Sequence, residues 1–106
     1  MLKLTQDNFE KEVLQAEGNI FVYFSKDGWP PCGLIKPFLA GCEEKYSKDL
    51  PFAEYNVAEG REITVAQGIK GFPTTAVYVD GKMVESTDEV TYKDEGFIES
   101  MIKRYI

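Results

Sequence analysis

Residues 24–37 read FSKDGWPPCGLIKP, and this stretch decides the fold. It follows an unbroken apolar and aromatic run, Ile20 to Phe24, which is typical of a central strand covered on both faces. The polar and glycine residues at 25–29 predict a loop. The two prolines after it predict a helix from about Pro31 to Tyr46, because a proline lacks the N–H group that the first helical turn leaves unpaired anyway. Pro37 falls inside this helix and is expected to kink it.

The flanking sequence predicts helices and strands in alternation. Asp7 and Glu10 have the spacing of a capping box, which predicts a first helix that ends at Gly18 and presents Phe9 and Val13 on one face. Farther along, the patterns predict a strand at 52–57, a short helix at 62–67, and two strands at 74–79 and 82–86 around the hairpin turn Asp80-Gly81.

A last helix is expected after Thr91 and Asp94, which again have capping-box spacing; its apolar face would hold Phe97, Ile98, Met101, Ile102 and Tyr105. The predicted order is α-β-α-β-α-β-β-α, which indicates an α/β fold. Strands joined through helices are expected to be parallel and the final hairpin antiparallel, so the sheet should be mixed.

Two segments resemble the thioredoxin family. In that family a W-C-G-P-C run is followed by a proline five residues after its second cysteine, and here Pro37 stands five residues after Cys32. Cys32 therefore matches the second cysteine, Trp29 the first, and Gly28 the preceding tryptophan. Residues 71–74, GFPT, match the family's G-x-P-T loop, whose proline is cis.

The resemblance covers essentially the whole chain. It implies a thioredoxin fold, with residues 1–106 as a single domain in which helices on both faces flank a central mixed sheet of four to five strands. The Gly-x-x-Pro-Cys segment, without the usual tryptophan before it, is most similar to short thioredoxins of anaerobic, amino-acid-fermenting bacteria.

The resemblance also implies an activity. In the family the first cysteine is activated at a helix N-terminus and attacks a substrate disulfide, and the second cysteine resolves the mixed disulfide. The chain beside the cis-proline pairs with the substrate backbone as an added strand does. Carried over, residue 29 is the position of the nucleophile and Cys32 the resolving thiol, and the substrate surface comprises Gly28, Pro30, Pro31, Phe72 and Pro73. Protein disulfides would be the substrates and a thioredoxin reductase the electron donor, with no bound cofactor.

The sequence departs from the family at three positions. Trp29 has no thiol, so the dithiol cycle cannot run with this residue. Tyr23 stands where the family usually has a buried aspartate, and Glu54 where a lysine accompanies it, so the usual proton-relay pair is missing and Tyr23 is expected to be a core aromatic residue. Cys42 cannot replace the missing thiol: on one helix it would lie about 15 Å from Cys32, whereas a disulfide spans at most about 7 Å between α-carbons. Cys42 is expected to be a small buried apolar residue.

Three interpretations of Trp29 stay open. The codon could be UGA, one base from the tryptophan codon UGG, with selenocysteine as the native residue. Trp29 could be an introduced substitution of a cysteine. It could also be the native residue of a redox-inactive protein that binds partners through the Trp29/Pro73 groove, with Trp29 as an exposed aromatic anchor. A monothiol reaction of Cys32 is a weaker fourth option, since the sulfur at this position is shielded in the family.

Composition limits the partners and the compartment. The 106 residues hold 12 Lys and Arg against 18 Asp and Glu, a net charge of −6, which argues against nucleic acid or an anionic membrane as a partner. Two cysteines and no histidine supply too few ligands for zinc or an iron–sulfur cluster. The first residues, MLKLTQD, show no apolar run typical of a secretion signal. We expect a cytoplasmic monomer without a metal.

Overall fold

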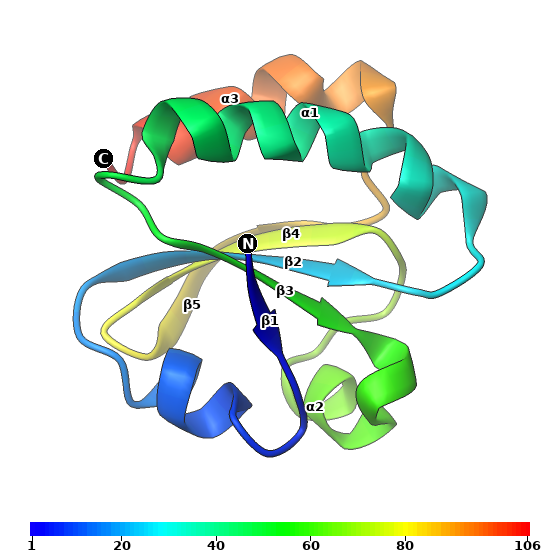
Figure 1. The fold of residues 1–106 in the computed structure, drawn as a ribbon, viewed down its shortest axis with the longest axis vertical. Helices are drawn as coiled ribbons and strands as arrows, with labels where there is room; N and C mark the ends of the chain where they lie inside the picture. The colour runs from blue at the N-terminus through cyan, green and yellow to red at the C-terminus, as the bar shows by residue number, and fades with distance from the viewer.

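The computed structural model describes the backbone of residues 1–106 and the side chains of all of them except Tyr92. Its centre is a five-stranded mixed sheet in the order β1-β3-β2-β4-β5, with helices on both faces (Figure 1). The strands are β1 (Leu2–Leu4), β2 (Asn19–Ser25), β3 (Phe52–Asn56), β4 (Thr74–Val79) and β5 (Lys82–Thr87). The helical segments are η1 (Glu10–Leu14), α1 (Pro30–Tyr46), η2 (Val57–Glu59), α2 (Arg61–Ala66), η3 (Tyr92–Asp94) and α3 (Glu95–Lys103). The predicted α/β class and mixed sheet are confirmed.

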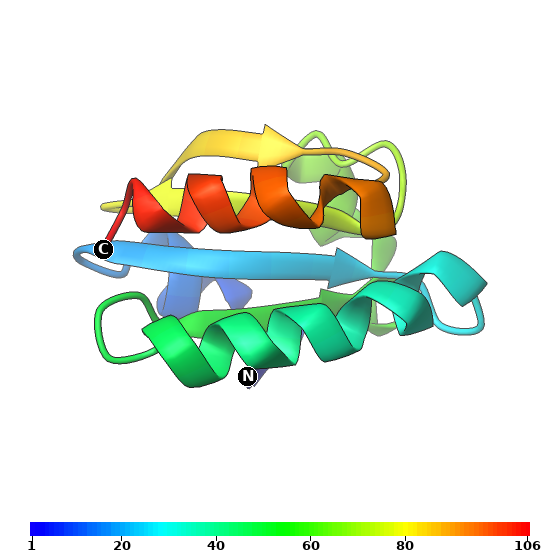
Figure 2. The same cartoon turned by 90° about the horizontal axis from the view of Figure 1, so that it is seen from above.

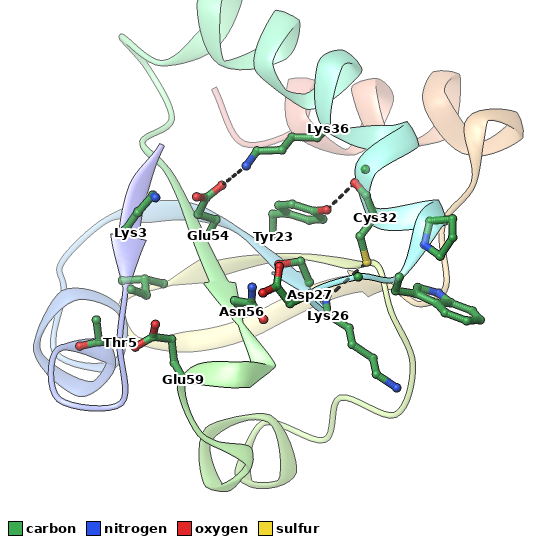
Figure 3. Close-up of a pocket in the computed structure, with 16 residues that line it drawn as sticks. Lys3, Thr5, Tyr23, Lys26, Asp27, Cys32, Lys36, Glu54, Asn56 and Glu59 are labelled. Atoms are coloured by element: carbon green, nitrogen blue, oxygen red, sulfur yellow. Dashed lines mark hydrogen bonds and ion pairs between the residues drawn. The ribbon is translucent and has the colours of Figure 1, made fainter.

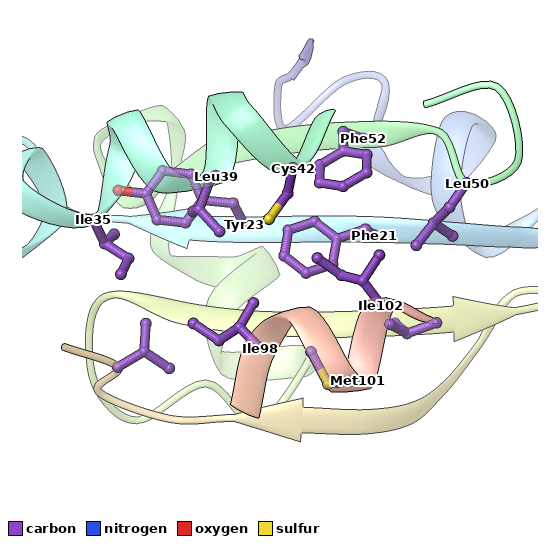
Figure 4. Packing of buried hydrophobic residues seen from close by; sticks show 12 residues of the cluster. Phe21, Tyr23, Ile35, Leu39, Cys42, Leu50, Phe52, Ile98, Met101 and Ile102 are labelled. Carbon is purple, nitrogen blue, oxygen red and sulfur yellow. The ribbon is translucent and has the colours of Figure 1, made fainter. Parts of the chain in front are cut away.

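The central strand β2 separates two apolar clusters. Phe21 and Tyr23 face α1 and α3, whereas Val22 and Phe24 face the opposite side, where η1 packs. Figure 2 shows α1 and α3 side by side over one face of the sheet, and Figure 4 shows the side chains that fill the space between these helices and the strands. Successive side chains of a strand point to opposite faces, so a strand covered on both sides carries the continuous apolar run seen in the sequence.

The direction of β4 differs from the sequence expectation. β2 and β3 are parallel, as predicted, but β4 runs antiparallel to β2 although α2 connects it to β3. The reason is the length of α2: its six residues extend only about 9 Å, about half the length of a typical strand. The chain therefore returns to the sheet at the edge where β3 ended, and β4 starts there.

The N-terminal segment also differs from the prediction. Leu2–Leu4 is a strand parallel to β3, and the helix that follows is a five-residue π-helix. The capping interaction joins Thr5 and Asn8 rather than Asp7 and Glu10: the Thr5 N–H donates to Asn8 Oδ1 at 2.6 Å, and the Asn8 N–H donates to Thr5 Oγ1 at 3.2 Å. These two hydrogen bonds close the turn between β1 and η1, whose own N-cap, Phe9, has no side-chain cap.

The C-terminal half follows the prediction closely. Asp80 and Gly81 both have positive φ, 49° and 83°, as the two-residue hairpin requires. The Asp94 carboxylate accepts a hydrogen bond from the Thr91 N–H at 2.7 Å, which confirms that half of the capping box. Phe97 was wrongly assigned to the buried face of α3, since 58% of its surface is exposed.

Pro37 lies within α1, as expected. A proline at this position removes the N–H group that would pair with the carbonyl of Gly33, and both residues are exposed, so water can take the place of the missing donor. In the described part of the chain, none of the helices combines the length and the apolar character that crossing a membrane requires.

Gly81 supplies a test of the hairpin. A Cβ atom at this position would overlap the backbone carbonyl of Leu14, whereas Gly28, with a similar φ of 75°, faces open space. We expect Gly28→Ala to lower the free energy of unfolding by about 1–2 kcal/mol, the cost of a left-handed backbone. Gly81→Ala should lower it by at least about 3 kcal/mol, because the backbone must also move apart. Urea denaturation measures both, and equal losses would contradict the packing of η1 against the hairpin.

Candidate functional site

The loop between β2 and α1 places residue 29 at the start of a helix. Trp29 is the N-cap of α1, with φ −88° and ψ 113°, and Pro30 and Pro31 fill the first two helical positions. The Trp29 N–H donates to the Lys26 carbonyl at 3.1 Å, and the Cys32 N–H donates to the Trp29 carbonyl at 3.0 Å. Trp29 and Cys32 therefore stand one turn apart, at the positive end of the helix dipole.

Cys32 is held from two directions. Its side chain is buried, and Sγ accepts a hydrogen bond from the Lys26 N–H at 3.4 Å. Beneath it, the Tyr23 hydroxyl donates to the Cys32 carbonyl at 2.8 Å (Figure 3). Both cysteines of the chain are free thiols.

Tyr23 combines two roles. It is a core residue, as expected, and it also fixes the first turn of α1 through its hydroxyl. Burial, followed by the charge of the neighbouring Cys32, raises the pKa of Tyr23 well above its usual range. The phenol therefore stays neutral at physiological pH and can donate but not act as a base.

The cis-proline loop lies on one side of Trp29. The Phe72–Pro73 peptide bond is cis, as the resemblance implied, and the Trp29 indole Nε1–H donates to the Phe72 carbonyl at 3.1 Å. The register of the sheet explains this proximity, because Phe24 at the end of β2 lies opposite Thr74 at the start of β4. The structure thus brings Trp29, Cys32 and the Phe72–Pro73 loop together.

A groove opens on the other side of Trp29. It has a volume of about 670 Å³ and is bounded by the start of α1 and the ends of β1, β2 and β3 (Figure 3). Gly28, Trp29, Pro30 and Cys32 line it, whereas Phe72 and Pro73 lie outside it, as does Pro31. Polar and apolar side chains both line the groove, and its charged residues have both signs.

Several groove residues escaped the sequence analysis: Lys3, Thr5, Lys36, Asn56 and Glu59. Lys3 belongs to β1, for which no strand was predicted, and Thr5 belongs to the turn after it. The alternation of Leu2, Lys3 and Leu4 is the strand signal that could have found them. Lys36 extends over the groove from α1 and forms an ion pair with Glu54 at 3.7 Å.

Cys42 is a core residue, as predicted. It lies on α1 facing Phe21 and Phe52 (Figure 4). Burial, then the nearby Glu99 carboxylate, raises the pKa of Cys42 to about 11, so its thiol stays protonated at neutral pH. The helical separation from Cys32 is about 15 Å, too far for a disulfide.

Comparison with known proteins agrees with this geometry. The sequence model of the thioredoxin family matches residues 1–104. The chain belongs to the thioredoxin family. It is 33% identical to a thioredoxin of Acetoanaerobium sticklandii over 108 aligned positions that cover all of both chains. It is 31% identical to a thioredoxin of Peptoclostridium acidaminophilum, covering all of this chain and 96% of that protein. A thioredoxin of Pseudomonas aeruginosa is 30% identical over 82% of this chain and 80% of its own length.

These relatives confirm the predicted resemblance to thioredoxins of anaerobic bacteria. Thioredoxins belong to a thiol–disulfide redox lineage, in which protein disulfides are reduced and a thioredoxin reductase supplies the electrons. Membership of this family accounts for the cis peptide bond before Pro73 and for the position of Cys32 in the first turn of α1.

The hydrogen bond between Tyr23 and Cys32 can be tested by alkylation. Cys32 in the native chain should react slowly with iodoacetamide at neutral pH, because its sulfur is buried. Tyr23→Phe leaves the Cys32 carbonyl without its donor, which should lower the free energy of unfolding by about 1–2 kcal/mol and speed Cys32 alkylation about fivefold through local opening of the helix start.

Tyr78→Phe is the matched control. It removes the hydroxyl of a tyrosine that is as buried as Tyr23, and this hydroxyl donates to Gln67 Oε1 at 2.6 Å. This variant should lose similar stability and leave the Cys32 rate unchanged. Mass spectrometry of the labelled peptides separates Cys32 from Cys42. Rapid alkylation of Cys32 in the parent chain, or equal rates in both variants, would contradict the account.

Proposed function

We propose that the site is built for thiol–disulfide exchange with protein substrates, with residue 29 at the nucleophile position and Cys32 as the resolving thiol. The observation that carries this proposal is the position of Trp29, one helical turn before Cys32 and in contact with the Phe72 carbonyl beside the cis-proline. A sulfur or selenium atom at position 29 would complete a reacting pair with Cys32.

The reaction follows from this geometry. A thiolate or selenolate at position 29 would be stabilised by the N-terminus of α1 and would attack one sulfur of a substrate disulfide, releasing the other as a thiolate. Cys32, after losing its proton, would then attack the atom at position 29 and release the second substrate thiolate. The substrate gains two electrons, and the pair at 29 and 32 becomes oxidised.

With tryptophan at position 29 this cycle cannot begin, so the chain as given is expected to be inactive in disulfide reduction. The native residue would then be cysteine or selenocysteine. The codon decides between them: UGA supports selenocysteine, a cysteine codon in the parent gene supports a substitution, and UGG ends the selenocysteine interpretation.

The alternative is a redox-inactive module that binds protein partners through the surface formed by Trp29 and Pro73, on the side of Trp29 that faces the cis-proline loop. It is favoured by one observation, the 48% exposed surface of Trp29 beside the cis-proline loop. Large aromatic side chains of this kind often anchor interfaces.

The remaining roles are part of the same proposal. Phe72 and Pro73 form the platform for the substrate backbone, and Gly28, Pro30 and Pro31 shape the surface around position 29. The partners are protein disulfides and a thioredoxin reductase, without nucleic acid or membrane. The protein acts in the cytoplasm as a single-domain monomer without a bound cofactor.

An insulin reduction assay with dithiothreitol tests the proposal. The parent chain should be no faster than dithiothreitol alone, and Trp29→Cys should accelerate precipitation of the insulin B chain at least tenfold over it. The matched controls are Trp29→Ser and the double variant Trp29→Cys/Cys32→Ser, both of which should stay at the background rate. If Trp29→Cys folds and is inert, the redox proposal fails and the binding module remains.

A further inference from the structure

Three successive backbone carbonyls precede β4, and each has a hydrogen-bond donor. The Gly71 carbonyl accepts from the Thr74 hydroxyl at 2.7 Å, and the Pro73 carbonyl accepts from the Val90 N–H at 2.8 Å. The Phe72 carbonyl between them accepts from the Trp29 indole at 3.1 Å. Thr74 and Val90 are fully buried, whereas Trp29 is half exposed. Of the three donors, only the indole can leave without opening the core.

The Phe72 carbonyl lies where an extended chain could pair. β4 begins at Thr74 and its neighbours in the sheet are β2 and β5, so residue 72 lies outside the paired ladder. Pro73 has no N–H group, and its carbonyl is occupied by Val90. The carbonyl of Phe72 is therefore the acceptor that an added strand would use in this loop.

The Trp29 side chain lies at the surface, where about half of it is exposed. It projects from the N-cap, which has an extended rather than helical backbone. Besides the hydrogen bond to Phe72, Lys26 Nζ approaches the indole ring at 6.0 Å from its centroid, and both side chains are exposed. Rotation about the side-chain bonds of Trp29 would free the Phe72 carbonyl and leave the backbone hydrogen bonds of the loop intact.

We propose that Trp29 is a clasp: in the free chain its indole occupies the Phe72 carbonyl, and an extended peptide segment of a partner protein must displace it to pair there. The peptide as occupant rests on the substrate surface of the proposed function, whereas the clasp belongs to the form of the chain that has tryptophan at position 29. The clasp makes the opposite prediction from an aromatic anchor, which would contribute to binding rather than oppose it.

The test is peptide affinity with and without the indole. The probe is the S-carboxymethylated B chain of insulin, an unfolded peptide that has no free thiol. NMR titration of the ¹⁵N-labelled protein measures its dissociation constant for the parent chain, Trp29→Phe and Trp29→Ala. We expect both variants to bind the peptide about fivefold more tightly than the parent chain, the ratio that one net hydrogen bond supplies.

Ile106→Ala is the control, since it removes an exposed apolar side chain far from the clasp and should leave the affinity unchanged. Asn19 at the start of β2 binds the carbonyl of the neighbouring Tyr105, whereas the clasp follows the other end of β2. In the parent chain, whose only tryptophan is Trp29, the single indole N–H signal should move toward its position in unfolded protein as the peptide binds.

The clasp is overturned if Trp29→Phe and Trp29→Ala bind the peptide no more tightly than the parent chain, including the case in which none of the three binds. Weaker binding by both variants would identify Trp29 as an anchor. These outcomes are independent of the insulin assay: an active Trp29→Cys with no gain in peptide affinity for Trp29→Phe leaves the redox proposal standing and removes the clasp.

Discussion

The site depends on one topological constraint, the return of the chain at the sheet edge where β2 ends. Because α2 is too short to carry the chain back across the sheet, β4 starts opposite Phe24 and runs antiparallel to β2. The cis-proline loop at the start of β4 is thereby placed beside the first turn of α1. The contact between the Trp29 indole and the Phe72 carbonyl is the visible result.

A second layer of contacts fixes the helix start from below. Tyr23 supplies its hydroxyl to the Cys32 carbonyl, and the Lys26 backbone supplies its N–H to the Cys32 sulfur. A neutral phenol under the helix holds the turn in place without adding a buried charge. The neutral phenol cannot accept a proton, and the adjoining space is the open groove lined by Glu54 and Lys36.

The sequence predicts what local pattern and motif determine. Local sequence correctly predicted three features: the strand β2 from its apolar run, the start of α1 from its prolines, and the hairpin turn from Asp80-Gly81. The strand Leu2–Leu4 was missed because its alternation extends over only three residues, which is a weak signal without the pairing with β3. The predicted direction of β4 was wrong because a helix between two strands was expected to make them parallel. The six residues of α2 are too few to carry the chain back along the sheet.

The site could be assembled from the sequence only through the resemblance. Helical geometry predicts that Trp29 and Cys32 lie one turn apart. It does not predict the contact between Trp29 and the Phe72–Pro73 loop, which lies at least forty residues farther along the chain. The groove beyond Trp29 was not predicted, since its residues come from three strand ends that only the folded sheet brings together. Phe97 was misplaced because an apolar residue on an amphipathic helix need not face the core.

The most direct test of the central claim is whether positions 29 and 32 can be joined. If residue 29 stands at the nucleophile position, mild oxidation of Trp29→Cys should form an intramolecular disulfide with Cys32, seen as the loss of two hydrogen atoms and of two alkylation sites, and reversed by dithiothreitol. If the oxidised variant instead remains fully reduced or forms only disulfide-linked dimers, the two positions do not have the geometry of a redox pair, and the account is wrong.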